Sequence, residues 1–147
     1  MSGTTNIPAV CVLIRKGDEL LFVKRAHTGY QDGKYTVPAG HVDAGESFRQ
    51  AGVREALEEV GLKLEPSQLR HIHTQHTYRG DGPVRIHMFF EADNWSGEPK
   101  NMEPHVHSEM VWLPINDLPY DDIMDMVADG IKRGLAGEVY GEFGWPE

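Results

Sequence analysis

The 147-residue sequence predicts an α/β fold built from several strands and two helices. Three observations support this prediction: short β-branched apolar runs, a capped helix before the middle of the chain, and an amphipathic helix near its end. A chain of this length fits one domain that buries roughly two-thirds of its unfolded surface. The expected strands are residues 7–15, 20–25, 35–38, 69–78, 84–92 and 110–113.

The first two strands are expected to form a hairpin. Residues 7–15 and 20–25 are apolar, and the residues between them are polar and include Gly17. This pattern predicts two antiparallel strands joined by a turn of about four residues. The polar loop 26–34 follows, and we expect it to approach the functional site.

The first helix is expected to start near Ser47 and to end at Gly61. Ser47 with Gln50 is a capping-box pattern, and Gly61 supplies the left-handed residue that ends many helices. At about 100° per residue, one side of this helix gathers acidic side chains and another gathers apolar ones. The acidic residues are Glu55, Glu58 and Glu59, and the residues expected to be buried are Val53, Ala56, Leu57 and Val60.

The second helix is expected over residues 121–135, after a break at Pro119. Its expected apolar face consists of Ile123, Met126, Val127 and Ile131. The segment 137–147 is acidic but carries the aromatic residues Tyr140, Phe143 and Trp145. We expect this tail to dock on its own domain or on a partner subunit.

Composition limits the possible partners and compartments. The net charge of −9 argues against binding to a nucleic-acid polymer, which needs a basic footprint. The single cysteine, Cys11, cannot form an internal disulfide, which suits the reducing cytoplasm. No apolar stretch reaches membrane-spanning length, and residues 1–8 lack a signal-peptide pattern. The expectation is a cytoplasmic protein with no membrane contact.

The three glutamates of the first helix predict a metal site. Like charges this close on a helix repel each other, and a hard divalent cation would offset the repulsion. Carboxylate oxygens are the ligands that Mg2+ and Mn2+ prefer. A solvated acidic face is the alternative, but it leaves unexplained the loop between Gly40 and Gly45, which leads into the helix as anion-binding loops do.

The same residues carry a resemblance to a known family. Gly40, Glu46 and the run Arg54-Glu55-Ala56-Leu57-Glu58-Glu59-Val60-Gly61-Leu62 resemble the Nudix box, Gly-x5-Glu-x7-Arg-Glu-U-x-Glu-Glu-x-Gly-U, where U is a bulky aliphatic residue. Ala56 is the one departure, since it is small where the box has an aliphatic residue. The resemblance implies a Nudix fold, an α/β/α sandwich around a mixed β-sheet. It covers about residues 7–135 of a single domain, 1–147.

The resemblance also implies roles for individual residues. The implied metal ligands are Glu55, Glu58, Glu59, the backbone carbonyl of Ala39 and Glu103, with Glu98 and Glu109 as rivals for the last place. Glu58 or Glu103 is the implied general base, and Arg54 is a catalytic residue that pairs with Glu46 or with a neighbouring box carboxylate. Arg25 and Gly40 are implied to bind substrate, with a plain surface charge as the alternative for Arg25. Glu46, Gly45 and Gly61 are expected to shape the box.

Histidines and aromatic residues leave alternatives open. His71 and His73 are expected on one strand face, and His105 and His107 repeat the spacing. A zinc site is conceivable there, but no cysteine or nearby carboxylate completes it, so surface or partly buried histidines are favoured. Three aromatic residues are candidates to stack on a base or to fill the core, with core favoured for two of them. They are Tyr30, Tyr35 and Trp95.

The predicted function is Mg2+-dependent hydrolysis of a diphosphate linkage in a nucleoside diphosphate linked to another group. A nucleoside triphosphate or modified deoxynucleotide, cleaved to nucleoside monophosphate and pyrophosphate, is the leading substrate class. Alternatives are an ADP-ribose or nucleotide-sugar pyrophosphatase, a non-catalytic nucleotide-sensing domain, and an isomerase. The isomerase would need a cysteine near the site, and Cys11 in the first strand is expected to be poorly placed for this. A homodimer is possible.

Overall fold

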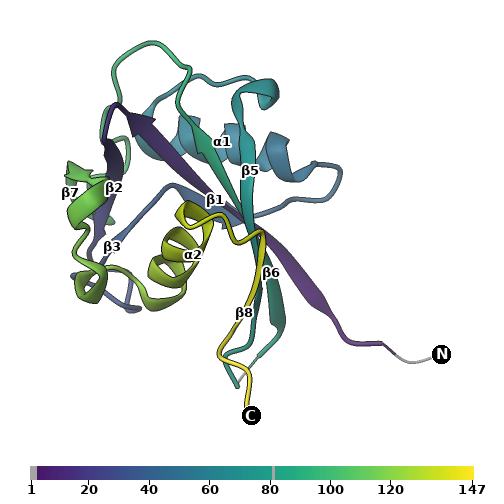
Figure 1. The fold of residues 1–147 in the computed structure, drawn as a ribbon. Helices are drawn as coiled ribbons and strands as arrows, with labels where there is room; N and C mark the ends of the chain where they lie inside the picture. Colours follow the sequence, from purple (N-terminus) through teal and green to yellow (C-terminus); the bar gives the residue numbers. More distant parts are fainter. Residues whose placement is uncertain (1–2, 81) are drawn as a thin grey trace.

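The computed structural model describes residues 3–80 and 82–147, which fold around an eight-stranded mixed sheet (Figure 1). Helix α1 (Phe48–Val60) covers one face of the sheet and α2 (Asp125–Leu135) covers the other, each over its own hydrophobic core. The α/β/α sandwich is therefore confirmed. The strands are β1 (Asn6–Lys16), β2 (Glu19–Arg25), β3 (Tyr35–Thr36), β4 (Ala39–His41), β5 (Arg70–Thr77), β6 (Val84–Ala92), β7 (His107–Pro114) and β8 (Tyr140–Phe143). Among the described residues, no helix is long and apolar enough to cross a bilayer.

The expected hairpin of β1 and β2 is only a short contact. Their antiparallel pairing is limited to Arg15 with Leu20 and Lys16 with Glu19, so the turn is shorter than expected. Beyond it the strands separate: β1 pairs in parallel with β6, and β2 pairs in antiparallel fashion with β7. Each long-range pairing joins more residues than the two pairs of the hairpin. The partner strands lie far apart in the sequence, so local patterns do not predict these pairings.

Helix α1 begins and ends where the sequence predicts. Ser47 is the N-cap with both capping-box hydrogen bonds to Gln50, and Gly61 ends the helix in the left-handed conformation, at φ 68°. The predicted buried face is partly wrong, because Leu57 is 50% exposed while Glu55 and Glu59 are buried. The small residues of the helix allow this close approach to the sheet: a Cβ on Gly52 would lie 3.3 Å from Val12 Cγ2 on β1.

Helix α2 is shorter than predicted and starts at Asp125. Residues Tyr120–Asp122 form a separate 3-10 turn, and Ile123 leaves it in an extended conformation that bridges to Tyr35. Ile123 is still buried in the same core as Met126, Val127 and Ile131. The apolar pattern was therefore informative about burial but not about where the helix begins.

The prediction that His71 and His73 share a face of β5 is wrong. A β-bulge shifts the register between them, so that His71 pairs with Phe90 and His73 with Phe89, consecutive residues of β6. His71 therefore packs edge-on against Phe90 in the α1 core, and His73 against Phe89 in the α2 core. An extra residue in one strand reverses the alternation of side chains.

The aromatic tail docks on its own chain, one of the two places expected for it. Strand β8 pairs in parallel with β5 at the edge of the sheet. Beyond β8, the Trp145 ring stacks on Tyr78 with centroids 4.9 Å apart, and its Nε1 donates to the carbonyl of His76 at 2.8 Å.

Candidate active site

Arg54 is the centre of an ion-pair cluster that joins α1 to the preceding loop. Its Nε and Nη2 donate to the two carboxylate oxygens of Glu46 at 2.7 and 3.0 Å. Its Nη1 donates to Glu55 Oε1 at 2.8 Å, and Nη2 also donates to the carbonyl of His41 at 3.0 Å. Hydrogen bonds from Arg54 and from the backbone of Asp43 hold the pKa of Glu46 below its ordinary value. The expected pairing of Arg54 with Glu46 is present in the structure.

Gly40 is the residue that lets the Glu55 carboxylate lie against β4. A Cβ at position 40 would stand 2.2 Å from Glu55 Oε1 and 2.4 Å from its Cδ. Because Arg54 Nη1 donates to the same oxygen, Glu55 Oε1, the carboxylate has little freedom to move away. The first glycine of the box is thus required by close packing, in addition to bordering the cavity described below.

Replacing Gly40 by Ala should reduce turnover about 100-fold, since a displacement near 1 Å at a reacting centre has an effect of this size. The displaced group would be the Glu55 carboxylate. Steady-state kinetics would measure the loss. Gly3→Ala is the control, because a Cβ there meets nothing within 4 Å. Turnover of Gly40→Ala equal to that of Gly3→Ala would contradict the role assigned to this contact.

Glu59 is the most buried carboxylate of the box. Its Oε2 accepts a hydrogen bond from the backbone N–H of Ala39 at 2.9 Å. Burial, then hydrogen bonding with Glu55, raises the pKa of Glu59 well above its ordinary value. In the β1–β4 pairing, Val12 N–H donates to Pro38 and Val42 N–H to Pro8, and this alternation directs the N–H and C=O of Ala39 away from β1. The Ala39 carbonyl is therefore free of the ladder.

The loop before β7 delivers a second carboxylate to Glu59. Lys100 N–H donates to Val60 O and Met102 N–H donates to Glu59 O, so the loop is fastened to the last carbonyls of α1. Glu103 follows, and one of its oxygens lies within 4.8 Å of ligand atoms of both Glu59 and His107. Such a group of oxygen and nitrogen donors could hold a divalent cation.

Three other predicted acidic residues, Glu58, Glu98 and Glu109, are not part of this cluster. The side chain of Glu58 is 52% exposed at the rim, 3.4 Å from Arg54 Nη1. Glu98 is exposed, and Glu109 is exposed on β7, where its Oε1 accepts a hydrogen bond from the Tyr35 hydroxyl at 3.3 Å. Of the three candidates for the additional carboxylate, Glu103 is thus the one grouped with Glu59.

Sequence reasoning missed His107 as part of this cluster. The sequence offers it, together with His105, only as part of a conceivable zinc site, which is disfavoured because no cysteine or nearby carboxylate completes it. The structure brings two carboxylates from other segments, Glu59 and Glu103, to its ring. The only signal in the sequence that could have pointed to His107 as a ligand was its position just after the polar loop that contains the candidate ligand Glu103.

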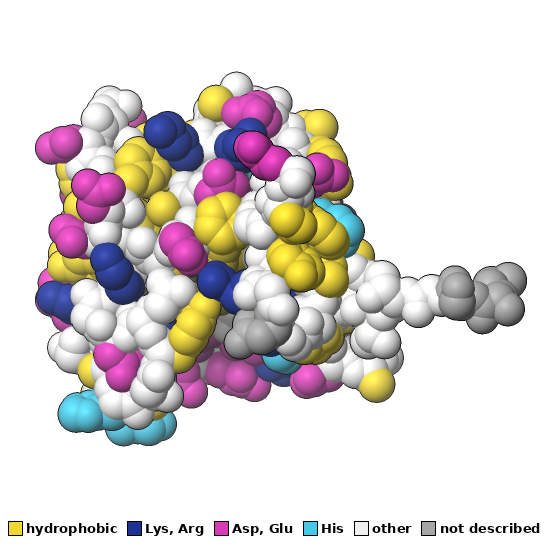
Figure 2. All heavy atoms as spheres, turned by 90° about the horizontal axis from the view of Figure 1, so that it is seen from below, with side chains coloured by type: hydrophobic (Ala, Val, Ile, Leu, Met, Phe, Trp, Pro, Cys, Tyr) yellow, Lys and Arg dark blue, Asp and Glu magenta, His cyan; other side chains and the backbone are white. Residues whose placement is uncertain are grey.

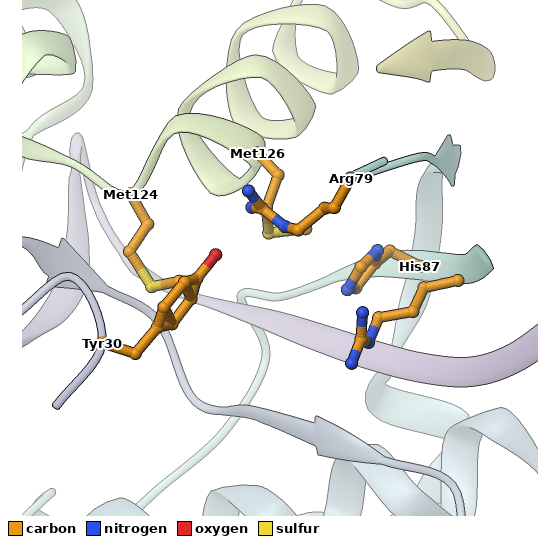
Figure 3. A pocket seen from close by; sticks show the side chains of 6 residues that line it. Tyr30, Arg79, His87, Met124 and Met126 are labelled. Atoms are coloured by element: carbon orange, nitrogen blue, oxygen red, sulfur yellow. The ribbon is translucent and has the colours of Figure 1, made fainter. Parts of the chain in front are cut away.

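A hollow extends from β4 to loop 26–34, made of two adjoining cavities of about 410 and 200 Å³. The residues shared by both cavities are Arg85, His87, Met124 and Met126. The smaller cavity reaches Ala39, Gly40 and Arg25, and the larger one reaches Tyr30 and Arg79. Figure 3 shows Tyr30 and Met124 on one side of the larger cavity and Arg79 and His87 on the other.

Cations and an aromatic ring line the ends of this hollow. The guanidinium groups of Arg25 and Arg79 both lie over the Tyr30 ring, each 5.7 Å from its centroid. Arg25 also donates from Nε to Tyr30 O at 2.8 Å, so it organises the loop while it borders the cavity. Burial lowers the pKa of His87 to about 4, so its ring is neutral at pH 7.

Two of the three aromatic candidates belong to the core. Tyr35 packs edge-on against Phe22, and Trp95 stacks on Trp112. Tyr30 alone of the three lines the hollow. Figure 2 shows acidic and basic side chains interspersed over one face of the molecule.

Cys11 lies closer to the site than expected. It pairs with Ala39 across β1 and β4 and lines the smaller cavity. Burial, with the nearby charge of Glu59, raises the pKa of the thiol far above its ordinary value. The thiol is therefore protonated at neutral pH and does not meet the need of an isomerase for a reactive cysteine.

Known proteins resemble this chain in sequence and in fold. NAD-capped RNA hydrolase NudC of Citrobacter koseri is 35% identical over 112 residues, 76% of this chain but 40% of that protein, and NudC of Escherichia coli matches equally well. A MutT NUDIX hydrolase from Burkholderia pseudomallei superposes with a TM-score of 0.77 at 24% identity, covering 87% of this chain and 97% of that one. A NUDIX hydrolase from Nitrosomonas europaea gives 0.75 at 25% identity, covering 92% and 93%.

The sequence match covers 40% of the NudC protein, so this chain spans less than half the length of the NudC relatives. The family itself is recognised over most of this chain, since the NUDIX domain matches residues 5–131. Together with the complete box around Arg54, this match establishes that the chain belongs to the Nudix hydrolase family.

Proposed function

We propose that this protein hydrolyses a phosphoanhydride bond in a nucleoside diphosphate linked to another group, with nucleoside triphosphates and modified deoxynucleotides as the preferred class. The observation that carries the proposal is the continuity of the hollow. One end borders Ala39 and Gly40 beside the buried carboxylates, and the other end is lined by Tyr30 and Arg79, while Met124 and Met126 line both parts. A charged group fits the first end and a flat apolar base fits the second.

The residues of the box fit a divalent cation, because they supply ionisable oxygens around a buried position. We propose Glu55, Glu58, Glu59, Glu103 and the Ala39 carbonyl as ligands for Mg2+, with Mn2+ as a substitute. Such a cation neutralises phosphoryl charge and lowers the pKa of bound water. Arg54 keeps Glu55 in place through its bonds to Glu46 and to the His41 carbonyl.

The reaction then needs a group that takes a proton from water as the oxygen attacks phosphorus and the anhydride oxygen leaves. Glu58 and Glu103 are both proposed for this step, since one stands exposed at the rim and the other projects from the loop. Arg25 borders the smaller cavity with its guanidinium partly free, which suits contact with a phosphate.

Product analysis tests the proposal. The purified protein is incubated with Mg2+ and nucleoside triphosphates, oxidised deoxynucleotides, ADP-ribose and nucleotide sugars, and the products are separated by anion exchange. Nucleoside monophosphate with pyrophosphate is the expected result. AMP with ribose phosphate would instead assign the ADP-ribose branch. Binding without metal-dependent turnover of any substrate would overturn the proposal in favour of a nucleotide-sensing domain.

A second candidate substrate follows from the relatives. The NudC proteins are named NAD-capped RNA hydrolases, so NAD and NAD-capped RNA belong in the same panel. The net charge of −9 favours the free dinucleotide over the polymer. Three further statements remain predictions. They are a single domain over 1–147 with a core of about 7–135, a cytoplasmic location, and a possible homodimer. Fractionation and light scattering would test the last two.

A further inference from the structure

The cluster of Glu59, Glu103 and His107 contains a nitrogen donor among carboxylates. The ligand atoms of the three residues lie within 4.8 Å of one another. His107 Nε2 faces Glu59 Oε1 at 3.8 Å, which is too long for a hydrogen bond. The two groups therefore face each other without forming a hydrogen bond.

The His107 ring lacks the partners that a buried imidazole normally has. Its side chain is only 7% exposed. Among the residues of 3–80 and 82–147, no hydrogen-bond partner reaches its fully buried Nδ1. The Nε2 that faces Glu59 Oε1 is likewise too far from it for a hydrogen bond. Buried polar atoms are nearly always satisfied, so a buried ring that lacks a hydrogen bond at Nδ1 to any described residue and faces a carboxylate through Nε2 without bonding it indicates a missing ligand.

The backbone holds the ring in this position. The N–H of His107 donates to Glu103 O at 2.9 Å, and its carbonyl accepts a hydrogen bond from Asn101 Nδ2 at 2.8 Å. Asn101 Oδ1 in turn accepts the N–H of Glu103 at 3.2 Å. The loop thus fixes Glu103 and His107 relative to each other before any ligand binds.

We propose that Glu59, Glu103 and His107 form a mixed carboxylate–imidazole cation site in which His107 supplies a nitrogen ligand. Imidazole suits first-row transition ions, whereas Mg2+ takes oxygen ligands almost exclusively. The site therefore favours Mn2+ or Zn2+ over Mg2+ more strongly than an all-oxygen box does. This inference rests on the proposed function only in expecting a cation at the box.

The test uses Mn2+ as a spectroscopic probe of the intact protein. Electron spin-echo modulation of bound Mn2+ should contain the signal of a directly coordinated 14N nucleus. Labelling the wild-type protein with [15N]histidine should convert that signal to the 15N pattern, and this arm needs no substitution. In His107→Gln the nitrogen signal should disappear, and Mn2+ affinity should fall at least about tenfold, with Mg2+ affinity changed far less.

His105→Gln is the matched control, since His105 is exposed in the same loop and lies outside the cluster. It should keep the nitrogen signal and the Mn2+ affinity. Bound Mn2+ without any histidine nitrogen signal in the wild type would overturn the inference while leaving metal-dependent hydrolysis intact. If no substrate is hydrolysed but the nitrogen signal is clear, the proposed function is refuted while the proposed cation site is supported.

Discussion

Glu59→Gln is expected to reduce hydrolytic turnover about 10³-fold, the scale of losing one preorganised charged group at a reacting phosphate. The amide is nearly the same size and retains an oxygen that can accept the Ala39 N–H. The loss would therefore report the missing carboxylate charge. Glu109→Gln is the control, because that residue is exposed on β7 outside the cluster. Near wild-type turnover in Glu59→Gln would remove this residue from the metal site.

The same substitution should raise the midpoint of thermal unfolding of the metal-free protein. Burial raises the folded-state pKa of Glu59 above its ordinary 4.5. The folded state therefore keeps a proton that the unfolded chain releases above pH 4.5, and the wild-type protein loses stability as pH rises through this window. Gln does not titrate. The difference in midpoint, measured in EDTA, should grow between pH 5 and about pH 9, and an unchanging difference would contradict it.

Arg54→Gln is expected to lower the midpoint of thermal unfolding by roughly 5 °C or more. The substitution removes the paired bonds to Glu46 and the bond to Glu55, and it leaves the buried Glu55 carboxylate without its cation. Turnover should fall as well, because Glu55 is no longer held beside Gly40. Arg54→Lys should recover only part of the loss, since an ammonium group cannot reproduce the paired contact.

Scanning calorimetry against pH measures this effect. Arg54 depresses the folded-state pKa of Glu46 below 4.5, so its stabilisation is present above pH 4.5 and disappears as pH falls through the folded-state pKa. The gap between wild type and Arg54→Gln should shrink below pH 4.5. Arg133→Gln, which breaks a half-buried pair with Asp129 and an exposed pair with Glu138, is the control and should change the midpoint less. Equal effects of the two substitutions would refute the special role of Arg54.

Local patterns in the sequence predicted those structural features that depend on residues close together in the chain. The start and end of α1 and its capping by Ser47 follow from short spacings. The pairing of Arg54 with Glu46 was one of two pairings that the resemblance to the box implied. Leu57 was misplaced because helix periodicity gives relative angles but not which side meets the sheet. The side of the helix that meets the sheet depends on small residues such as Gly52, where an added Cβ would crowd Val12 on β1 as well as Leu69. Such crowding is a property of tertiary packing and not of the local sequence.

Features that depend on distant segments could not be predicted from the sequence. The pairing of β2 with β7 and the bulge between His71 and His73 are properties of strand partners, not of local composition. The carboxylate–imidazole cluster joins a helix, a loop and a strand through backbone bonds from Lys100 and Met102. Backbone groups leave no trace in residue type, and for that reason His107 was not recognised.

Strand β8 has a consequence for solubility. It occupies the outer edge of the sheet and pairs with β5, whose unpaired N–H and C=O groups would otherwise form a template for association with other chains. β8 itself is a short edge, and it is followed by Gly144 in a left-handed conformation and then by Pro146, neither of which extends a strand. The tail thus protects the sheet against edge-to-edge aggregation.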